Sequence, residues 1–257
     1  MAQNNQKLYQ VLADSVVMTD TPEMIAEATT ELLFGERVEV IGQDDEEWVK
    51  CHSLVDGYEG FVPRGELDTE ITAPTHKIAT IRGFSYTEAD YKSPPVRSLS
   101  FGSPLSIFME EDGYALLMQG GWVPLEQISK IDSYEKDIAK TAERFLGIPY
   151  LWGGRTSIGL DCSALVQLSL LQAGMPCPRD SKDQIKSVGD AIEFGDTIAN
   201  GALQRGDLVF LKGHVGIMIN DKEIINATSR HMRVIVEDLQ DVSDCYGGIL
   251  SVRRVRL

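Results

Sequence analysis

The chain has 257 residues and a formal net charge of −15, because 39 acidic side chains outnumber 24 basic ones. A surface this acidic repels the phosphates of nucleic acids and anionic lipids, so we expect neither a nucleic acid nor a membrane as partner. No stretch reaches the roughly 18 apolar residues of a membrane span, and the polar start lacks the apolar core of a secretory leader, so we expect a cytoplasmic protein. The four cysteines lack metal-ligand spacing, and we expect no metal and no cofactor.

The first half of the chain contains an internal repeat. Its matching segments are 33–40 and 100–107 near the start of each copy, and 60–63 and 121–124, both Gly-aromatic-Val-Pro, at its end. Short alternating strands separated by glycine and acidic turns are typical of small all-β barrels. We therefore predict two such barrels, over residues 1–70 and 71–131.

The Gly-aromatic-Val-Pro ending resembles that of bacterial SH3-like domains. Each copy also carries a Phe-Gly turn upstream of this ending. An aromatic residue beside a proline at the end of a barrel is usually buried, so we expect Phe61 and Trp122 to pack in the two cores.

From residue 132 the pattern becomes helical. Asp132 and Glu135 have the spacing of a capping box, which predicts a helix from there to Gly147. A second helix is predicted to begin near Cys162 and, being apolar on nearly all sides, to be buried. Three strand-like segments follow, at 208–211, 215–219 and 223–227. Residues 132–257 are therefore predicted to form an α+β domain.

Cys162 and His214 are the first candidates for chemistry. A thiol at a helix N-terminus lies in the positive end of the helix dipole, which lowers its pKa and favours the nucleophilic thiolate. His214 lies between glycines at the head of an apolar strand, which would leave room for a base beside the thiol. Taken alone, Cys162 fits a structural role equally well, and an isolated histidine near a strand start is usually structural. Together they indicate a nucleophile and its general base.

A third residue must orient the imidazole. If the strands at 215–219 and 223–227 form a hairpin with a three-residue loop centred on Asn220, Asn226 lies opposite His214 on the same face. Its amide oxygen could then hold the ring without adding a charge. An ordinary polar role for Asn226 stays open, since a two-residue turn would shift the register, and His231 is the alternative partner.

Four motifs in the second half of the chain carry a family resemblance. They are Tyr-Leu-Trp-Gly-Gly at 150–154, Asp-Cys-Ser-Ala at 161–164, Arg-Gly-Asp-Leu at 205–208 and Gly-His-Val-Gly at 213–216. Together they resemble the NlpC-type cysteine peptidases of bacterial cell-wall metabolism, which implies a papain-like α+β peptidase domain preceded here by two small all-β SH3-like barrels. One branch of that family places SH3-like modules first and comprises γ-D-glutamyl-L-diamino acid endopeptidases.

The resemblance implies roles for the residues that match the family motifs. Cys162 corresponds to the nucleophile and His214 to the general base. Tyr150 is similar to the tyrosine that holds the active site and the oxyanion region. The third position of the family is commonly histidine, so Asn226 departs from its usual form.

The branch also carries an Arg-Asp-Ser run where substrate is bound, and 179–181 is similar to it. The resemblance implies that Asp180 pairs with the ammonium of the substrate's terminal alanine, while Arg179 and Ser181 contact the substrate or brace the pocket. Ser181 with Gln184 also has the spacing of a capping box, so this serine could cap a helix.

Further candidates complete the expected substrate and oxyanion contacts. Asp161 and Ser163 flank the nucleophile. In the family branch the first SH3-like module forms an accessory wall of the site and contributes a tyrosine, for which Tyr58 is the candidate. Glu31 is a second candidate from this module, as a carboxylate for the amine. Both barrel residues fit solvated loop positions equally well.

The expected function is a cysteine peptidase that hydrolyses the γ-D-glutamyl–diamino acid bond of small muropeptides with a free N-terminal L-alanine, in peptidoglycan recycling. The acidic balance suits a small released peptide with an ammonium group better than an anionic polymer. A related amidase or acyltransferase on the same scaffold and a catalytically silent peptide-binding protein are the alternatives. Lysine or diaminopimelate at the third position, and the oligomeric state, stay open.

Overall fold

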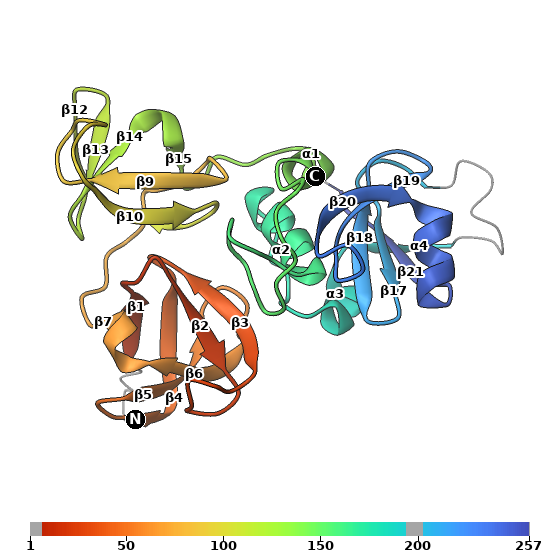
Figure 1. Ribbon diagram of the computed structural model, residues 1–257, viewed down its shortest axis with the longest axis horizontal. Coiled ribbons are helices and arrows are strands. Elements are labelled where there is room, and N and C mark those ends of the chain that lie inside the picture. The colour runs from red at the N-terminus through yellow and green to blue at the C-terminus, as the bar shows by residue number, and fades with distance from the viewer. Residues whose placement is uncertain (1–6, 194–202, 257) are drawn as a thin grey trace, which may run out of the picture. The chain divides into compact units, whose positions relative to one another are not determined.

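The computed structural model describes residues 7–193 and 203–256. The chain divides into two compact units, Met1–Ser133 and Tyr134–Leu257, which Figure 1 colours from red to yellow-green and from green to blue. The first unit consists of strands and short turns, whereas the second combines helices with a sheet. The finer division of the first unit at residue 70 stays a prediction.

The first barrel of this unit is built from one antiparallel sheet with strand order β3-β2-β6-β5-β4-β1-β7. Its strands are β1 (Leu8–Val11), β2 (Ser15–Thr19), β3 (Ala28–Leu33), β4 (Arg37–Asp44), β5 (Trp48–Ser53), β6 (Glu59–Pro63) and β7 (Leu67–Asp68). Side chains of successive residues point to opposite faces of a strand, so the apolar residues alternate into the interior. The fully buried Val38, Val49 and Val62 form the centre of this core.

The second barrel is built from two smaller sheets, with strand orders β10-β9-β14-β13-β12 and β11-β8-β15. Its strands are β8 (His76–Ile78), β9 (Arg82–Tyr86), β10 (Pro95–Ser100), β11 (Pro104–Leu105), β12 (Ile107–Glu111), β13 (Tyr114–Leu117), β14 (Trp122–Pro124) and β15 (Ile128–Lys130). In each barrel a single 3-10 turn, Arg64–Glu66 or Leu125–Gln127, follows the Val-Pro dipeptide. The repeat in the sequence therefore corresponds to a repeat in the structure.

Phe34 of the first barrel belongs to the core of the second. It is buried in one cluster with Ile78, Leu99, Leu105, Leu117 and Val123. The next residue, Gly35, has φ of +79°, and a Cβ atom there would lie 2.1 Å from the carbonyl oxygen of Pro104. Only glycine fits this approach, so the Phe-Gly turn joins the two barrels.

The aromatic residues of the two Gly-aromatic-Val-Pro endings are not core residues. Phe61 and Trp122 are both half-buried, whereas the following Val62 and Val123 are fully buried. The period of two along a strand explains this difference, because only one of two successive side chains can face the interior. The expectation that these aromatics pack in the cores was therefore wrong.

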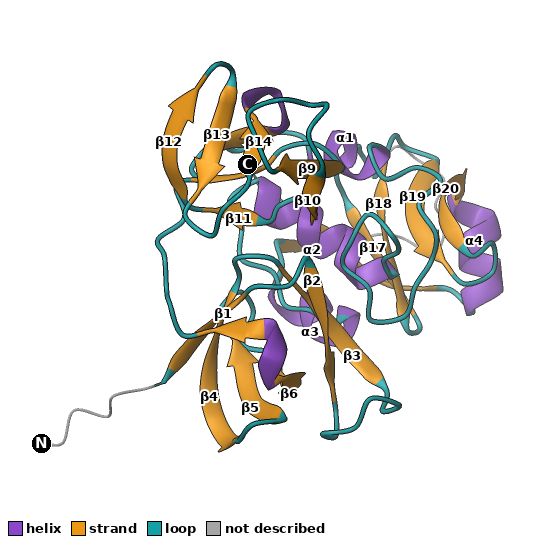
Figure 2. Cartoon of the chain, turned by 60° about the vertical axis from the view of Figure 1, so that its left-hand side comes forward, coloured by secondary structure: helices purple, strands orange, loops and turns teal. Residues whose placement is uncertain are grey.

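The second unit has a six-stranded antiparallel sheet with the order β16-β21-β17-β18-β19-β20. Its elements are α1 (Ile138–Glu143), α2 (Cys162–Gln172), α3 (Ser181–Ser187), β16 (Asp190–Ile192), β17 (Leu208–Leu211), β18 (His214–Met218), β19 (Glu223–Thr228), β20 (Arg233–Asp238), α4 (Leu239–Tyr246) and β21 (Ile249–Arg254). Figure 2 shows α2 and α4 on opposite sides of this sheet. No helix within the described ranges is long and apolar enough to cross a membrane.

The start of α1 differs from the predicted one. α1 begins at Ile138 rather than near Asp132, and its N-cap is Asp137, whose side chain accepts a hydrogen bond from the Lys140 N–H (3.0 Å). The predicted capping box at Asp132 and Glu135 was wrong. α2 begins at Cys162 as predicted, and all but its penultimate residue, Leu171, are buried.

Candidate active site

Cys162 is the first residue of α2, and its side chain is buried. The preceding residue, Asp161, caps the helix by accepting a hydrogen bond from the Ala164 N–H (2.9 Å). The backbone N–H groups of Val215 and Ser163 donate toward the sulfur. Burial nevertheless raises the pKa of the Cys162 thiol to about 12, because a thiolate loses more solvation than these donors replace. The lowered pKa expected at a helix N-terminus was wrong for the free protein.

His214 is the first residue of β18 and is also buried. Burial lowers the pKa of its imidazole to about 4, so the ring is neutral at pH 7. Because the N–H of the next residue, Val215, donates toward the Cys162 sulfur, the start of β18 lies beside the thiol. His214 Nε2 is 2.9 Å from Asn226 Oδ1.

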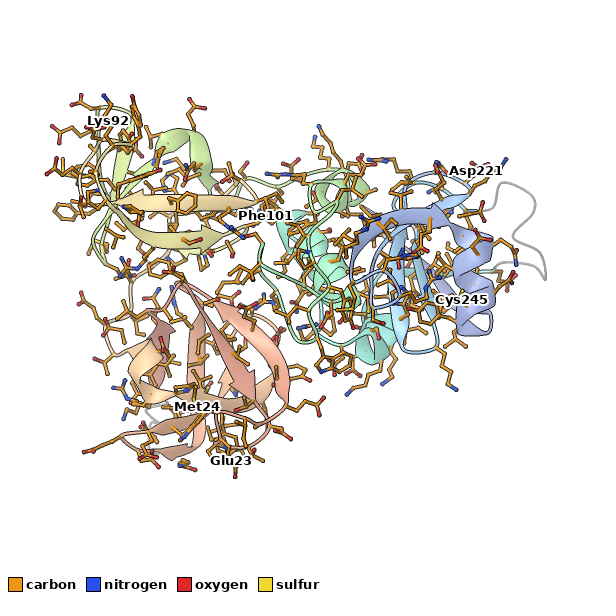
Figure 3. The ribbon with its side chains drawn as sticks, in the orientation of Figure 1. Glu23, Met24, Lys92, Phe101, Asp221 and Cys245 are labelled. Atoms are coloured by element: carbon orange, nitrogen blue, oxygen red, sulfur yellow. The ribbon has the colours of Figure 1, made fainter. Side chains whose placement is uncertain are left out.

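The hairpin formed by β18 and β19 brings His214 and Asn226 together in a register that differs from the predicted one. Ile217 pairs with Ile225, so the loop is centred on Asp221, labelled in Figure 3, one residue beyond the predicted centre. The register is therefore shifted by two residues. A shift of two keeps every side chain on its face of the sheet, so the two side chains meet diagonally instead of directly opposite.

Asn226 is held from its other side by a charged cluster. Its Nδ2 donates to Glu237 Oε2 (3.0 Å) on β20. The other carboxylate oxygen of Glu237 accepts a hydrogen bond from Arg230 Nη2 (2.6 Å) and lies 3.3 Å from Nε2 of His231. His231, the alternative partner for His214, thus contacts Glu237, and it is Asn226 that contacts His214.

Tyr246, the last residue of α4, covers the imidazole. Its ring stacks on the ring of His214 with centroids 4.4 Å apart and an interplanar angle of 1°. Sequence reasoning missed Tyr246, Glu237 and Arg230, because no motif surrounds them. The cap residues of α4, Asp238 and the left-handed Gly247, are the signal that could have located this helix.

The glycines beside His214 have backbone roles. Gly213 has φ of +69°, which favours glycine. A Cβ atom on Gly216 would lie 2.6 Å from Ile224 Cδ1 and 2.9 Å from the Ile225 carbonyl oxygen. Gly216 therefore allows β19 to approach β18 closely, whereas the expected room beside the imidazole stays a prediction.

Arg179, Asp161 and Ser163 form one buried network at the start of α2. The guanidinium of Arg179 makes two hydrogen bonds to the Asp161 carboxylate (2.8 and 2.6 Å) and one to Ser163 Oγ (2.8 Å). The same carboxylate accepts the N–H of Gly153 (3.0 Å), which belongs to the Tyr-Leu-Trp-Gly-Gly motif. Of the two roles considered for Arg179, this geometry favours bracing of the pocket.

Asp180 and Ser181 begin α3. Asp180 is the N-cap residue without a side-chain capping bond, and its carboxylate instead pairs with Lys182 Nζ (2.9 Å). Ser181 is the first helical residue, so the capping box predicted for it was wrong. The expected partner in that box, Gln184, is buried and donates to the carbonyl oxygen of Ser163 (2.9 Å).

Tyr150 lies near the nucleophile. Burial raises the pKa of its phenol, and the charge of Cys162 raises it further, which places the two side chains within electrostatic range. The remaining candidates belong to the first unit. Tyr58 packs against the core of the first barrel, and Glu31 accepts a hydrogen bond from Ser15 Oγ (2.7 Å). Their roles toward a substrate stay predictions.

Comparison with known proteins agrees with this geometry. The profile of the NlpC/P60 family matches residues 147–247, and that of the bacterial dipeptidyl-peptidase Sh3 domain matches residues 18–67. The gamma-D-glutamyl-L-lysine dipeptidyl-peptidase of Bacillus subtilis (strain 168) is 30% identical over 227 residues, which cover 77% of this chain and 71% of the relative. Dipeptidyl-peptidase 6 of Lysinibacillus sphaericus is 23% identical over 248 residues, which cover 88% of this chain and 89% of the relative.

A solved structure also resembles the whole chain. The crystal structure of an NlpC/P60 family protein from Bacillus cereus ATCC 10987 superposes with a TM-score of 0.80 and 20% sequence identity, over 96% of this chain and 99% of that one. The α+β fold class with an N-terminal all-β SH3-like region is thereby confirmed. The chain belongs to the NlpC/P60 family and is a cysteine peptidase.

Proposed function

We propose that this peptidase hydrolyses the bond between γ-D-glutamate and the diamino acid in muropeptides that carry a free N-terminal L-alanine, as peptidoglycan recycling requires. Two relatives similar over most of the chain carry dipeptidyl-peptidase names. The observation that carries the catalytic part is the hydrogen bond between His214 Nε2 and Asn226 Oδ1 beside the buried Cys162. A cytoplasmic location is the expectation that goes with this substrate.

The proposed reaction begins from a neutral thiol and a neutral imidazole. Asn226 accepts the hydrogen bond from Nε2–H, so Nδ1 carries the lone pair. As the Cys162 sulfur attacks the γ-carbonyl carbon of D-glutamate, its proton passes to Nδ1 of His214. The C–N bond breaks when His214 returns this proton to the departing amine. Water, deprotonated by His214, then hydrolyses the thioester and releases the acid.

The developing oxyanion needs donors that are already oriented. We assign this role to backbone N–H groups at the start of α2, with Tyr150 beside them. The Val215 and Ser163 N–H groups that point at the sulfur stabilise the thiolate as it forms. The raised pKa of the free thiol favours transfer of the proton during the attack over transfer before it.

Asp180 is the proposed acceptor for the ammonium of the terminal alanine. Its carboxylate now pairs with the Lys182 ammonium, which is largely exposed. An exposed pair of this kind contributes only about 0–1 kcal/mol, so a substrate ammonium can replace it readily. For Tyr58 and Glu31, a role toward the substrate stays a proposal that rests on the family resemblance alone. An acylated alanine offers no ammonium and would be excluded.

The test uses L-Ala-γ-D-Glu-diaminopimelate, its lysine analogue and their N-acetylated forms, with products identified by mass spectrometry. We expect the wild type to release the diamino acid only from the peptides with a free amine, and Cys162→Ala to release none. Asn226→His should keep activity, because an imidazole can also orient His214, whereas Asn226→Ala should lose most of it. Equal rates with and without the acetyl group would refute the amine pocket.

A further inference from the structure

We propose that Glu237 is a positioning residue that acts through Asn226 to fix the tautomer of His214. This inference rests on the proposed function, because it assumes that His214 is the base and Asn226 its partner. It goes beyond the three proposed catalytic residues by assigning a role to a fourth side chain, which touches neither the nucleophile nor, in this assignment, the substrate.

The three side chains form an oblique row across three neighbouring strands. His214 is on β18, Asn226 on β19 and Glu237 on β20. Asn226 is directly paired with Ile235, so Glu237, two residues further on, projects from the same face. The diagonal offset of two residues thus occurs on both sides of Asn226, and hydrogen bonds of 2.9 and 3.0 Å connect the row.

The chemistry of an amide makes this row directional. The side chain of Asn226 has one acceptor end and one donor end, whereas a carboxylate can only accept. Glu237 Oε2 therefore selects the orientation in which Nδ2 faces β20 and Oδ1 faces His214. With an acceptor in front of it, Nε2 carries the hydrogen, and Nδ1 keeps the lone pair that takes the thiol proton.

The opposite orientation of the amide would stop the reaction. It would place Oδ1 against the Glu237 carboxylate and present an N–H donor to Nε2. The imidazole would then carry its hydrogen on Nδ1, and that nitrogen could not accept a proton from Cys162. Without the carboxylate, Nδ2 of Asn226 would keep a long contact of 3.4 Å to the carbonyl oxygen of Ile235, so the productive orientation would be selected much more weakly.

The carboxylate itself is firmly held. The side chain of Glu237 is only 11% exposed. Its Oε1 accepts a hydrogen bond from Arg230 Nη2 (2.6 Å) and lies 3.3 Å from His231 Nε2. Arg230 also lies over the ring of Tyr246, 5.7 Å from its centroid, and contacts the sulfur of Cys245, labelled on α4 in Figure 3. Because Tyr246 stacks on His214, the same cluster fixes both the plane of the imidazole and the direction of its partner.

The test compares Glu237→Gln with Glu223→Gln. Both variants remove one negative charge, and Glu223 begins β19 as an exposed residue whose side chain contacts Asn220. Glutamine at 237 can offer a donor or an acceptor, so it no longer selects one orientation of Asn226. We expect kcat of Glu237→Gln to fall about 10- to 100-fold with KM unchanged, which is the effect of losing one charge-assisted hydrogen bond. Glu223→Gln should keep the wild-type rate.

Two further measurements separate positioning from a general loss of structure. Nitrogen-15 NMR of His214 at pH 7 should show the Nε2–H tautomer in the wild type and a mixture in Glu237→Gln. In an Asn226→Ala background, Glu237→Gln should change kcat no further, because the residue through which it acts is gone. A wild-type tautomer ratio in Glu237→Gln, or an equal loss of kcat in both backgrounds, would overturn the proposal. Failure of the proposed function would instead show as a wild type that leaves the peptides intact, and the tautomer measurement needs no substrate.

Discussion

Replacing Arg179 with methionine tests whether the Arg-Asp-Ser run begins with a structural residue or with one that binds substrate. Methionine keeps an unbranched side chain of similar reach but removes the guanidinium. The Asp161 carboxylate would then lose both of its bonds to Arg179, although it would keep those from the Ala164 and Gly153 N–H groups. The change leaves a buried charge without its counter-ion.

The magnitude follows from the burial of both partners. Side chains of Arg179 and Asp161 are 1% and 8% exposed. Removing one partner of such a pair typically costs 3–5 kcal/mol, so we expect the second unit to lose about that much of its free energy of unfolding. The unit spans residues 134 to 257, which is 124 residues. At about 2.1 cal/mol/K per residue its melting temperature should fall by about 12–19 °C.

Hydrogen exchange followed by mass spectrometry can measure this loss of stability in the second unit separately from the first. Amides of α2 should lose protection in Arg179→Met, while those of the first barrel keep theirs. Asp161→Asn is the matched variant, since asparagine preserves the N-cap but not the ion pair. Unchanged protection of α2, together with a KM raised for the substrate peptide, would refute the bracing role and return Arg179 to the substrate pocket.

Two more predictions concern β18. Gly216→Ala should lower the free energy of unfolding by about 1–3 kcal/mol, because the added Cβ would meet the Ile224 side chain and the backbone of β19. Urea titration measures this change, and an unchanged midpoint would contradict the close approach of the two strands. Between pH 6.5 and about 4 the unfolded state binds more protons at His214 than the folded state does, so stability should fall by about 3 kcal/mol as the pH is lowered through this range. Urea titrations at pH 7 and 4.5 should show a smaller loss in His214→Gln, and equal losses would argue against a buried neutral imidazole.

Local patterns predicted much of the fold. The start of α2 at Cys162 and the pair of barrels follow from short-range periodicity and from turn residues, which operate within a few positions of the chain. The strands β17, β18 and β19 were located for the same reason. β20 and α4 were not assigned, although Asp238 and Gly247 mark the ends of α4 as clearly as any cap in the chain. The helix start at Asp132 failed because Asp137 caps α1 instead.

The part of the site that depends only on which face of a strand a residue occupies could be predicted, because side chains alternate between the two faces. His214 and Asn226 share a face in any register shifted by an even number of residues, so their contact survived an error of two. Glu237 could not be found in this way, because its contact depends on the pairing of β19 with β20 across a turn that sequence did not reveal. The pKa of Cys162 depends on burial by distant segments, and helix position alone gave the opposite direction.

The insertion of Phe34 limits how this protein can be divided. A fragment that begins after residue 70 would lack Phe34, whose aromatic ring the first barrel contributes to the core of the second. Deleting such a ring from a core costs roughly 3–5 kcal/mol, a large share of the stability of a barrel of this size. A fragment that ends at residue 70 would expose Phe34 to water, which would make it prone to aggregate. We therefore expect a stable fragment of this region to contain both barrels.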